Sequence, residues 1–292
     1  MKKFVRALSP FLVGRLKAEP LFSDKLLPDM SKRKDAVFPA IRNDYVSFYY
    51  KGGGLFTYSK DGFKTHKKYA IAPENLSQNY IAESDLPNIV IKQSYTDAYD
   101  DVKDRCKAYG TLEASYVSEL YGYSGLSKSP VILLDTEIAF SGEDYDNEDN
   151  RNKQSSRVDL LLYDAKERLL CFCEAKHFGN GEIWASEGNR PEVYTQVERY
   201  NKIIADRYDE ILAEYKSYVA LFNDLFGSSI PEPESIYPKT GLLIFGYDKY
   251  QREKIRRLLE DDGSLIGLPH YTTGSISPTT MERLFNALTK ER

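Results

Sequence analysis

Apolar residues in the middle of the chain switch between the spacing of helices and the spacing of strands. From Ser94 to Tyr121 they recur every three or four residues, which predicts an amphipathic helical segment, with Gly110 as the break between two helices. Val131–Phe140 is predicted as a strand. Residues 158–163 and 169–176 are apolar on both faces at most positions, a pattern typical of strands that are covered on both sides.

The same alternation continues beyond residue 176. Pro191 opens a predicted helix that runs to about Phe226. Residues 241–247 are predicted as a short buried strand, residues 250–259 as a charged amphipathic helix, and a last helix begins at Thr280. This order of elements predicts an α/β (α+β) fold in which a mixed central sheet is flanked by helices.

The start of the chain shows the pattern of strands and tight turns. Residues 45–50 and 55–58 are rich in aromatic and β-branched side chains and flank the turn Gly52-Gly-Gly54, which predicts a hairpin. A second turn at residues 60–62 and a further strand around residues 69–72 would extend the hairpin into a small sheet.

The change of pattern predicts two domains, a β-rich module of residues 1–92 and a larger domain of residues 93–292. Lysines and aromatic residues interleave in the module, a mixture that can follow a nucleic-acid backbone and stack on its bases. The substrate-binding candidates are Lys64, Lys67 and Lys68. The alternative is that the aromatic residues form the core of the small sheet while the lysines protect its edges.

Composition favours a globular protein. The chain has 292 residues, of which 41% are hydrophobic, enough for a sizeable core. It has no run of eighteen apolar residues and no secretory signal pattern, so we expect a cytoplasmic protein without contact to a membrane. The three cysteines are too few for a disulfide framework, and their spacing does not match that of zinc ligands. We therefore expect them to pack in the core.

Charge is distributed unevenly along the chain. The first 77 residues carry 15 Lys and Arg against 7 Asp and Glu, a net of +8, whereas the remaining 215 carry 25 against 37, a net of −12. A basic start beside an acidic remainder fits a protein in which one region contacts phosphates and another holds carboxylates for a metal. The predicted partner is nucleic acid, and a homodimer or a partner protein is compatible with the sequence.

Charged residues interrupt the two apolar strands between residues 158 and 176. Asp159 lies in the first strand, and Glu174 and Lys176 share one face of the second because side chains alternate along a strand. A buried charge without a partner is so costly that such groups persist when they are paired or hold a metal. Two converging carboxylates therefore predict a divalent cation, and hard oxygen ligands suit Mg²⁺ or Mn²⁺.

These residues and the order of the elements around them resemble the PD-(D/E)XK nuclease superfamily over roughly residues 105–260, with Asp159 and then Glu174-Ala-Lys176 on consecutive strands. The resemblance implies a mixed sheet flanked by helices, in which Asp159 and Glu174 bind magnesium and Lys176 assists the attacking water. Val158 stands where many members of the superfamily have a proline before the first acid.

Two helix motifs support the resemblance. Gly110-Thr-Leu-Glu113 is similar to the Gly-x-x-x-Glu signature of many members, one residue shorter, and implies that Glu113 is a further metal ligand. Gln196-Val-Glu-Arg-Tyr200 is similar to the Gln-x-x-x-Tyr motif of the RecB-like branch. Residues four apart share a helix face, so Gln196 and Tyr200 are both predicted to point at the site.

The predicted function is a Mg²⁺-dependent deoxyribonuclease in repair, recombination or defence against foreign DNA. Metal-activated water would attack the phosphodiester in line, because the reaction needs a cation to neutralise developing charge. On the preceding strand Asp135 and Glu137 are equal candidates for an outer ligand. Three alternatives stay open: an RNA substrate, a catalytically inactive binding module of the same fold, and a structural protein in which Glu174 and Lys176 form a salt bridge.

Overall fold

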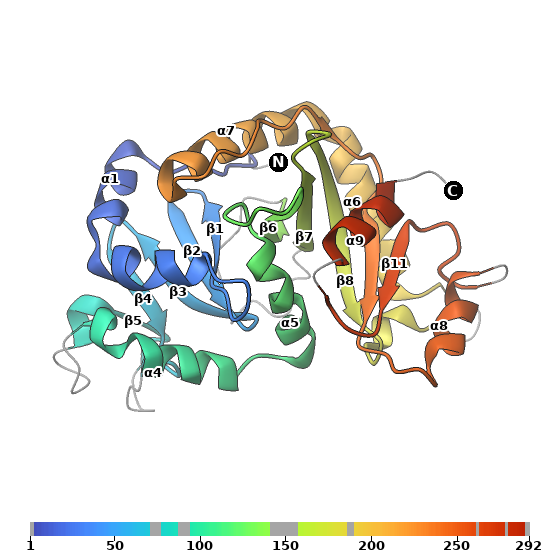
Figure 1. Ribbon diagram of the computed structural model, residues 1–292, viewed down its shortest axis with the longest axis horizontal. Coiled ribbons are helices and arrows are strands. Elements are labelled where there is room, and N and C mark those ends of the chain that lie inside the picture. The colour runs from blue at the N-terminus through green and yellow to red at the C-terminus, as the bar shows by residue number, and fades with distance from the viewer. Residues whose placement is uncertain are drawn as a thin grey trace. The chain divides into compact units, whose positions relative to one another are not determined.

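The computed structural model describes residues 3–70, 77–86, 94–140, 157–185, 190–260, 263–277 and 280–289 (Figure 1). The chain divides into two compact units. We call residues 5–128 and 217–230 the N-terminal unit, and residues 1–4, 129–216 and 231–292 the C-terminal unit. The boundary predicted at residue 92 therefore falls inside the N-terminal unit, which also includes the helical segment that follows it.

The N-terminal unit contains an antiparallel sheet whose strands neighbour one another in chain order. The strands described are β1 (Phe38–Arg42), β2 (Tyr45–Tyr50), β3 (Gly53–Ser59), β4 (Gly62–His66) and β5 (Tyr80–Ala82). The predicted hairpin is confirmed as β2 and β3. The strand predicted around residues 69–72 is wrong at Tyr69 and Ala70, which lie in a turn, and residues 71–72 lie outside the described residues. The strand that pairs with β3 is instead β4, which begins earlier in the chain.

Helical segments precede and follow the strands of this sheet along the chain. They are α1 (Pro10–Ala18), a π-helical turn η1 (Leu21–Leu26), α2 (Leu27–Met30), α4 (Tyr95–Ala108), α5 (Leu112–Val117) and the 3-10 segments η2 (Glu83–Asp85) and η3 (Ser118–Tyr123). Gly110 separates α4 from α5 as predicted. A Cβ atom there would lie 2.4 Å from the backbone oxygen of Lys51, so only glycine permits this close approach.

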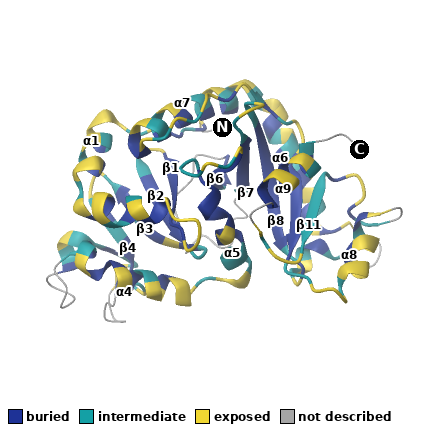
Figure 2. Cartoon of the chain, viewed as in Figure 1, coloured by how far each residue is buried: buried dark blue, intermediate teal, exposed yellow. Residues whose placement is uncertain are grey.

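Aromatic side chains form the core of the N-terminal unit. The ring centroids of Phe56 and Tyr95 lie 5.1 Å apart, which packs α4 against β3, and those of Tyr58 and Phe63 lie 4.6 Å apart. The aromatic residues that alternate with lysines in the sequence are all buried: Phe48, Tyr49, Tyr50, Phe56, Tyr58 and Phe63. Strand β2, which carries three of them, is coloured as buried over most of its length (Figure 2). The aromatic residues therefore form the core of the small sheet and not a surface that stacks on bases, because buried rings cannot reach a nucleic acid.

The C-terminal unit contains a mixed sheet with the strand order β11-β10-β8-β7-β6 and with β9 beside β8. The strands described are β6 (Val131–Ala139), β7 (Arg157–Asp164), β8 (Leu169–His177), β9 (Ser235–Ile236), β10 (Gly241–Phe245) and β11 (His270–Thr273). The sequential strands β6, β7 and β8 pair antiparallel, whereas β8, β10 and β11 pair parallel. The predicted mixed sheet is confirmed.

Its described helices are α6 (Glu192–Asp206), the first part of α7 (Tyr208–Phe226), α8 (Arg252–Leu259), α9 (Thr280–Thr289) and the 3-10 turn η5 (Gly181–Ile183). The one helix predicted between Pro191 and Phe226 is in fact two. Arg207, with φ −128°, leaves the helical conformation between them. Its guanidinium donates to the backbone oxygen of Phe140 at 2.6 Å and to Glu210 Oε2 at 2.8 Å, so tertiary contacts stabilise the break.

Helices cover both faces of the mixed sheet. On one face, Leu242 of β10 belongs to the same apolar cluster as Val197 of α6. On the opposite face, a Cβ atom on Gly241 would lie 2.4 Å from Leu288 of α9, so the glycine lets this helix approach the sheet closely. The sheet is the middle layer between helices, which confirms the predicted α+β fold and its two-sided apolar strands.

Within the part of the chain that the structure describes, no helix is long and apolar enough to cross a membrane. Cys106, Cys171 and Cys173 are free thiols and are buried, as expected for residues that pack in a core. Burial raises the pKa of Cys171 to about 12, so this thiol stays neutral.

Candidate active site

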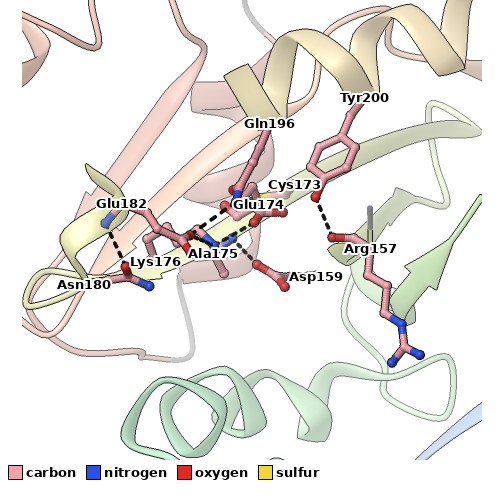
Figure 3. Close-up of polar contacts among 10 residues, drawn as sticks. All are labelled: Arg157, Asp159, Cys173, Glu174, Ala175, Lys176, Asn180, Glu182, Gln196 and Tyr200. Atoms are coloured by element: carbon pink, nitrogen blue, oxygen red, sulfur yellow. Dashed lines mark hydrogen bonds and ion pairs between the residues drawn. The ribbon is translucent and has the colours of Figure 1, made fainter. Parts of the chain in front are cut away.

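The candidate site lies where the ladder between β7 and β8 ends. The paired residues of these strands run from Asp164 and Leu169 to Leu160 and Cys173. Beyond this last backbone pair, the side chain of Asp159 forms the next hydrogen bond between the two strands. Its Oδ2 accepts a hydrogen bond from the backbone N–H of Ala175 at 2.8 Å. This bond holds the Asp159 carboxylate beside the end of β8 (Figure 3).

Glu174 and Lys176 form an ion pair at that end of β8. Lys176 Nζ lies 2.8 Å from Glu174 Oε1, and the two residues are only 7% and 2% exposed. The other carboxylate oxygen, Glu174 Oε2, is buried and has no hydrogen-bond partner among the described residues. A buried carboxylate oxygen without a donor is rare and costly, so this atom can accept a proton or a cation.

Negative charge exceeds positive charge around the Lys176 ammonium. Burial, together with the carboxylates of Glu174 and Glu137, raises the pKa of Asp159 well above its ordinary value. Burial also raises the pKa of Glu174 to about 7, although Lys176 acts in the opposite direction. Burial disfavours the charged form of Lys176, but the carboxylates of Glu174 and Asp159 outweigh it and raise the pKa of that ammonium. Lys176 therefore stays charged, but its single positive charge does not balance the carboxylates of Asp159, Glu174 and Glu137.

Asp135 and Glu137, which the sequence did not separate, differ in their surroundings. Both oxygens of the fully buried Asp135 accept hydrogen bonds, Oδ2 from the Tyr215 hydroxyl at 3.0 Å and Oδ1 from the Thr136 N–H at 2.8 Å. Glu137 instead raises the pKa of both Asp159 and Glu174 by its charge. Its φ of +53° lies in the left-handed region, which non-glycine residues adopt mainly at special positions. Glu137 is therefore the residue of this pair whose charge acts on Asp159 and Glu174, and its role as an outer metal ligand stays a prediction.

Gln196 and Tyr200 extend from one face of α6 toward the site, as their spacing predicts (Figure 3). The Tyr200 hydroxyl donates to the backbone oxygen of Arg157 at 2.7 Å. Burial and the charges of Glu174 and Asp159 raise the pKa of Tyr200, so it remains a phenol. Gln196 Nε2 donates to Glu182 Oε2 at 3.4 Å, and Gln196 Oε1 is a buried acceptor without a partner among the described residues.

Glu182 is a residue of the site that no sequence pattern indicated. This residue lies in η5, where its N–H donates to Asn180 Oδ1 at 2.9 Å, and its Oε2 is 2.7 Å from Lys176 Nζ. A glutamate in a glycine- and asparagine-rich loop has no periodic neighbours that would reveal its direction. The one signal in the sequence is its distance from Lys176, six residues along the chain.

Glu113 and the three candidate lysines belong to the N-terminal unit. Glu113 lies in the first turn of α5. Lys64 Nζ pairs with Asp61 at 3.0 Å, and the Lys68 ammonium lies 5.5 Å from the centre of the Tyr109 ring. Lys67 follows the end of β4. Roles of Glu113 in metal binding and of the lysines in substrate binding stay predictions.

Among the described residues, no group of three or more His, Cys, Asp or Glu side chains is arranged to hold a metal ion. Mg²⁺ requires less, because it commonly keeps several waters and binds through one or two carboxylates together with substrate phosphates. Asp159 and Glu174 fit this smaller set: they supply hard oxygen donors, excess negative charge and, at Glu174 Oε2, an acceptor without a partner.

Comparison of the chain with protein-family models, curated proteins and solved structures finds no match. The resemblance to PD-(D/E)XK nucleases therefore rests on the motif residues and on the order of the elements that carry them. Chemically, two carboxylates beside a lysine can bind a divalent cation and stabilise an anion that approaches it.

Proposed function

We propose that this protein is a metal-dependent nuclease that hydrolyses phosphodiester bonds, with DNA as its substrate, in repair, recombination or defence against foreign DNA. The observation that carries the proposal is the charge imbalance at the end of β8. Asp159 and Glu174 come from adjacent strands and share the Lys176 ammonium, while Glu174 Oε2 has no partner among the described residues. A divalent cation would correct both the missing charge and the missing contact.

Each residue has a distinct role in this proposal. Asp159 and Glu174 would hold Mg²⁺ or Mn²⁺, which supplies a more nucleophilic water and neutralises charge on the phosphate. Lys176 would orient that water and stabilise the negative charge that develops on phosphate oxygens. Because its neighbours raise its pKa, Lys176 keeps its proton at neutral pH and is a poor candidate for a general base.

The excess of basic residues at the start of the chain supports a polyanionic substrate. The first 77 residues carry a net charge of +8, and Lys64, Lys67 and Lys68 would contact phosphates. Since the neighbouring aromatic rings are buried, contact with the nucleic-acid backbone is favoured over base stacking. The triple variant K64E/K67E/K68E should bind DNA more weakly and with a smaller salt dependence, and unchanged affinity and salt dependence would remove the three lysines from the proposal.

Cleavage assays test the activity directly. Linear and circular DNA, single- and double-stranded, and RNA would be incubated with Mg²⁺ or Mn²⁺ and wild-type protein, D159N or K176M. We expect metal-dependent cleavage of DNA that falls by a factor of at least about 10² in either variant, the size of effect typical for one lost transition-state contact. Cleavage of the circular substrate would show that free ends are not required.

Two matched variants control for nonspecific damage. D135N changes a buried aspartate on the neighbouring strand: its amide oxygen can still accept from the Tyr215 hydroxyl, and the bond from the Thr136 N–H is lost. K166M removes a lysine whose side chain is 84% exposed, in the turn between β7 and β8. Both should cleave at close to the wild-type rate. Binding of DNA without cleavage of any substrate would instead favour the catalytically inactive module, and equal losses in all four variants would contradict the assigned roles.

A further inference from the structure

Lys176 has two carboxylate partners that differ in position and exposure. Glu174 belongs to β8 and its side chain is 3% exposed, whereas Glu182 belongs to the following turn and its side chain is 34% exposed. Their oxygens lie 2.8 and 2.7 Å from Lys176 Nζ, so the ammonium already contacts both (Figure 3). The proposed metal would bind only one of the two, Glu174.

We propose that Glu182 is a positioning residue that holds the Lys176 ammonium when Glu174 binds a divalent cation. The inference rests on the proposed function. A cation at Glu174 competes with Lys176 for the same carboxylate and repels the ammonium. Because Lys176 is only 7% exposed, water cannot readily take over the lost contact. Glu182 offers a carboxylate at hydrogen-bond distance, so Lys176 can release Glu174 and still remain paired.

Contacts on two sides keep Glu182 in place for this role. Asn180 Oδ1 accepts its backbone N–H, which fixes the turn, and Gln196 Nε2 donates to the same Oε2 atom that contacts Lys176. Gln196 would thereby act on Lys176 through Glu182. An ion pair of ordinary surface residues needs neither contact, because exposed pairs contribute little and rearrange freely.

The test is metal binding without nucleic acid. Mn²⁺ affinity would be measured by calorimetry or by paramagnetic resonance for wild type, D159N, E182Q, K176M and E182Q/K176M. We expect E182Q to weaken Mn²⁺ binding by about tenfold, a typical coupling between contacting charges. In the K176M background the ammonium no longer competes, so the same substitution should change the affinity by less than about threefold.

A second acidic residue provides the matched control. Glu192 is exposed and lines the same open pocket as Glu182, together with Asn180, Gly181, Trp184 and Arg190. E192Q removes the same charge from this pocket and should change Mn²⁺ affinity by less than about twofold. If E182Q fails to fold, E182D carries the test, because its shorter side chain withdraws the carboxylate from Lys176 and should also weaken Mn²⁺ binding.

The outcomes separate the two proposals. No Mn²⁺ binding by wild type, or binding that D159N leaves unchanged, would overturn the proposed nuclease and this inference with it. Binding that D159N abolishes but E182Q leaves unchanged would overturn only the role of Glu182. If E182Q weakens Mn²⁺ binding equally in wild type and in K176M, the role of Glu182 is also overturned. Glu182 would then attract the metal by its charge alone and not through Lys176.

Discussion

The two units of this protein bury carboxylates in opposite ways. In the N-terminal unit, Asp29 is 6% exposed and contacts Lys103, Lys32 at 2.5 Å and the Tyr99 hydroxyl at 2.8 Å. Burial would raise the pKa of Asp29, but the hydrogen bonds from these three residues together lower it. In the C-terminal unit, Asp159 and Glu174 share Lys176 and both have a raised pKa.

The difference teaches how to distinguish a structural acid from a candidate functional one. Both units pay the desolvation cost of a buried carboxylate. Around Asp29 the protein supplies more than enough positive charge and all the donors that the carboxylate needs. Around Glu174 it leaves one oxygen without a partner among the described residues, which is destabilising unless a proton or an ion binds there. Such local imbalance is typical of sites that bind ligands or ions.

The largest effect is expected at the balanced site. D29A would leave the Lys103 ammonium, whose side chain is 12% exposed, without its carboxylate. Breaking a buried pair in this way costs about 3–5 kcal/mol of unfolding free energy, measured by denaturant titration. The control is D100A on α4, where the aspartate is exposed and the change should stay within about 0.5 kcal/mol. Equal effects in the two variants would contradict a structural role for Asp29.

The pH dependence of stability should report the unbalanced site. Burial raises the pKa of Glu174 to about 7 in the folded protein, above its ordinary value of 4.5. The folded state therefore binds more protons in this window, and without divalent metal the unfolding free energy should fall as pH rises from about 4.5 to 7. We expect E174Q to remove a decrease on the order of 2–3 kcal/mol. Parallel curves for wild type and E174Q would show that Glu174 does not titrate in this range.

Two buried tyrosines sharpen the comparison. Tyr99 donates to the Asp29 carboxylate, and Tyr200 donates to the backbone oxygen of Arg157. Hydrogen bonds to charged acceptors contribute about 1.5–3 kcal/mol and those to neutral acceptors about 0.5–1.5 kcal/mol, so Y99F should destabilise more than Y200F. Thermal unfolding of both variants measures the difference, and the reverse order would argue against the charged state of Asp29.

The smallest effect should have the opposite sign at the two sites. D159N relieves repulsion with Glu174 and keeps an acceptor for the Ala175 N–H, so at pH 8 without metal it should stabilise the fold by about 1 kcal/mol. D29N should destabilise it, because Lys103 and Lys32 lose their counter-charge. Melting temperatures in a chelating buffer provide the measurement. Destabilisation by both variants would mean that Asp159, too, is a structural acid.

Much of the C-terminal unit follows from local pattern. The two-sided apolar runs predicted β7 and β8, and side-chain alternation placed Glu174 and Lys176 on one face, where they form an ion pair. Spacing along one helix predicted that Gln196 and Tyr200 point the same way. Each of these inferences needs only the geometry of one element, which the residues of that element determine.

Sequence patterns predict least where distant contacts decide local structure. The break at Arg207 depends on Phe140, which is far away in the sequence. The extent of the N-terminal unit likewise depends on the packing of α4 against β3. Aromatic residues beside lysines could have lined a binding surface or a core. Packing against α4 and burial show that these residues form a core. The alternation of residue types along the chain could not distinguish the two cases.

By itself the sequence predicted the strands β6, β7, β8 and β10, the shared helix face of Gln196 and Tyr200, and the three charged residues on β7 and β8. Only the tertiary structure decided that Asp159 caps the ladder through the Ala175 N–H, that the charge of Glu137 acts on Asp159 and Glu174, and that Glu182 reaches Lys176. The physical reason is range. Periodicity is set by neighbours along the chain, whereas burial, charge balance and loop direction depend on groups that only the folded chain brings together.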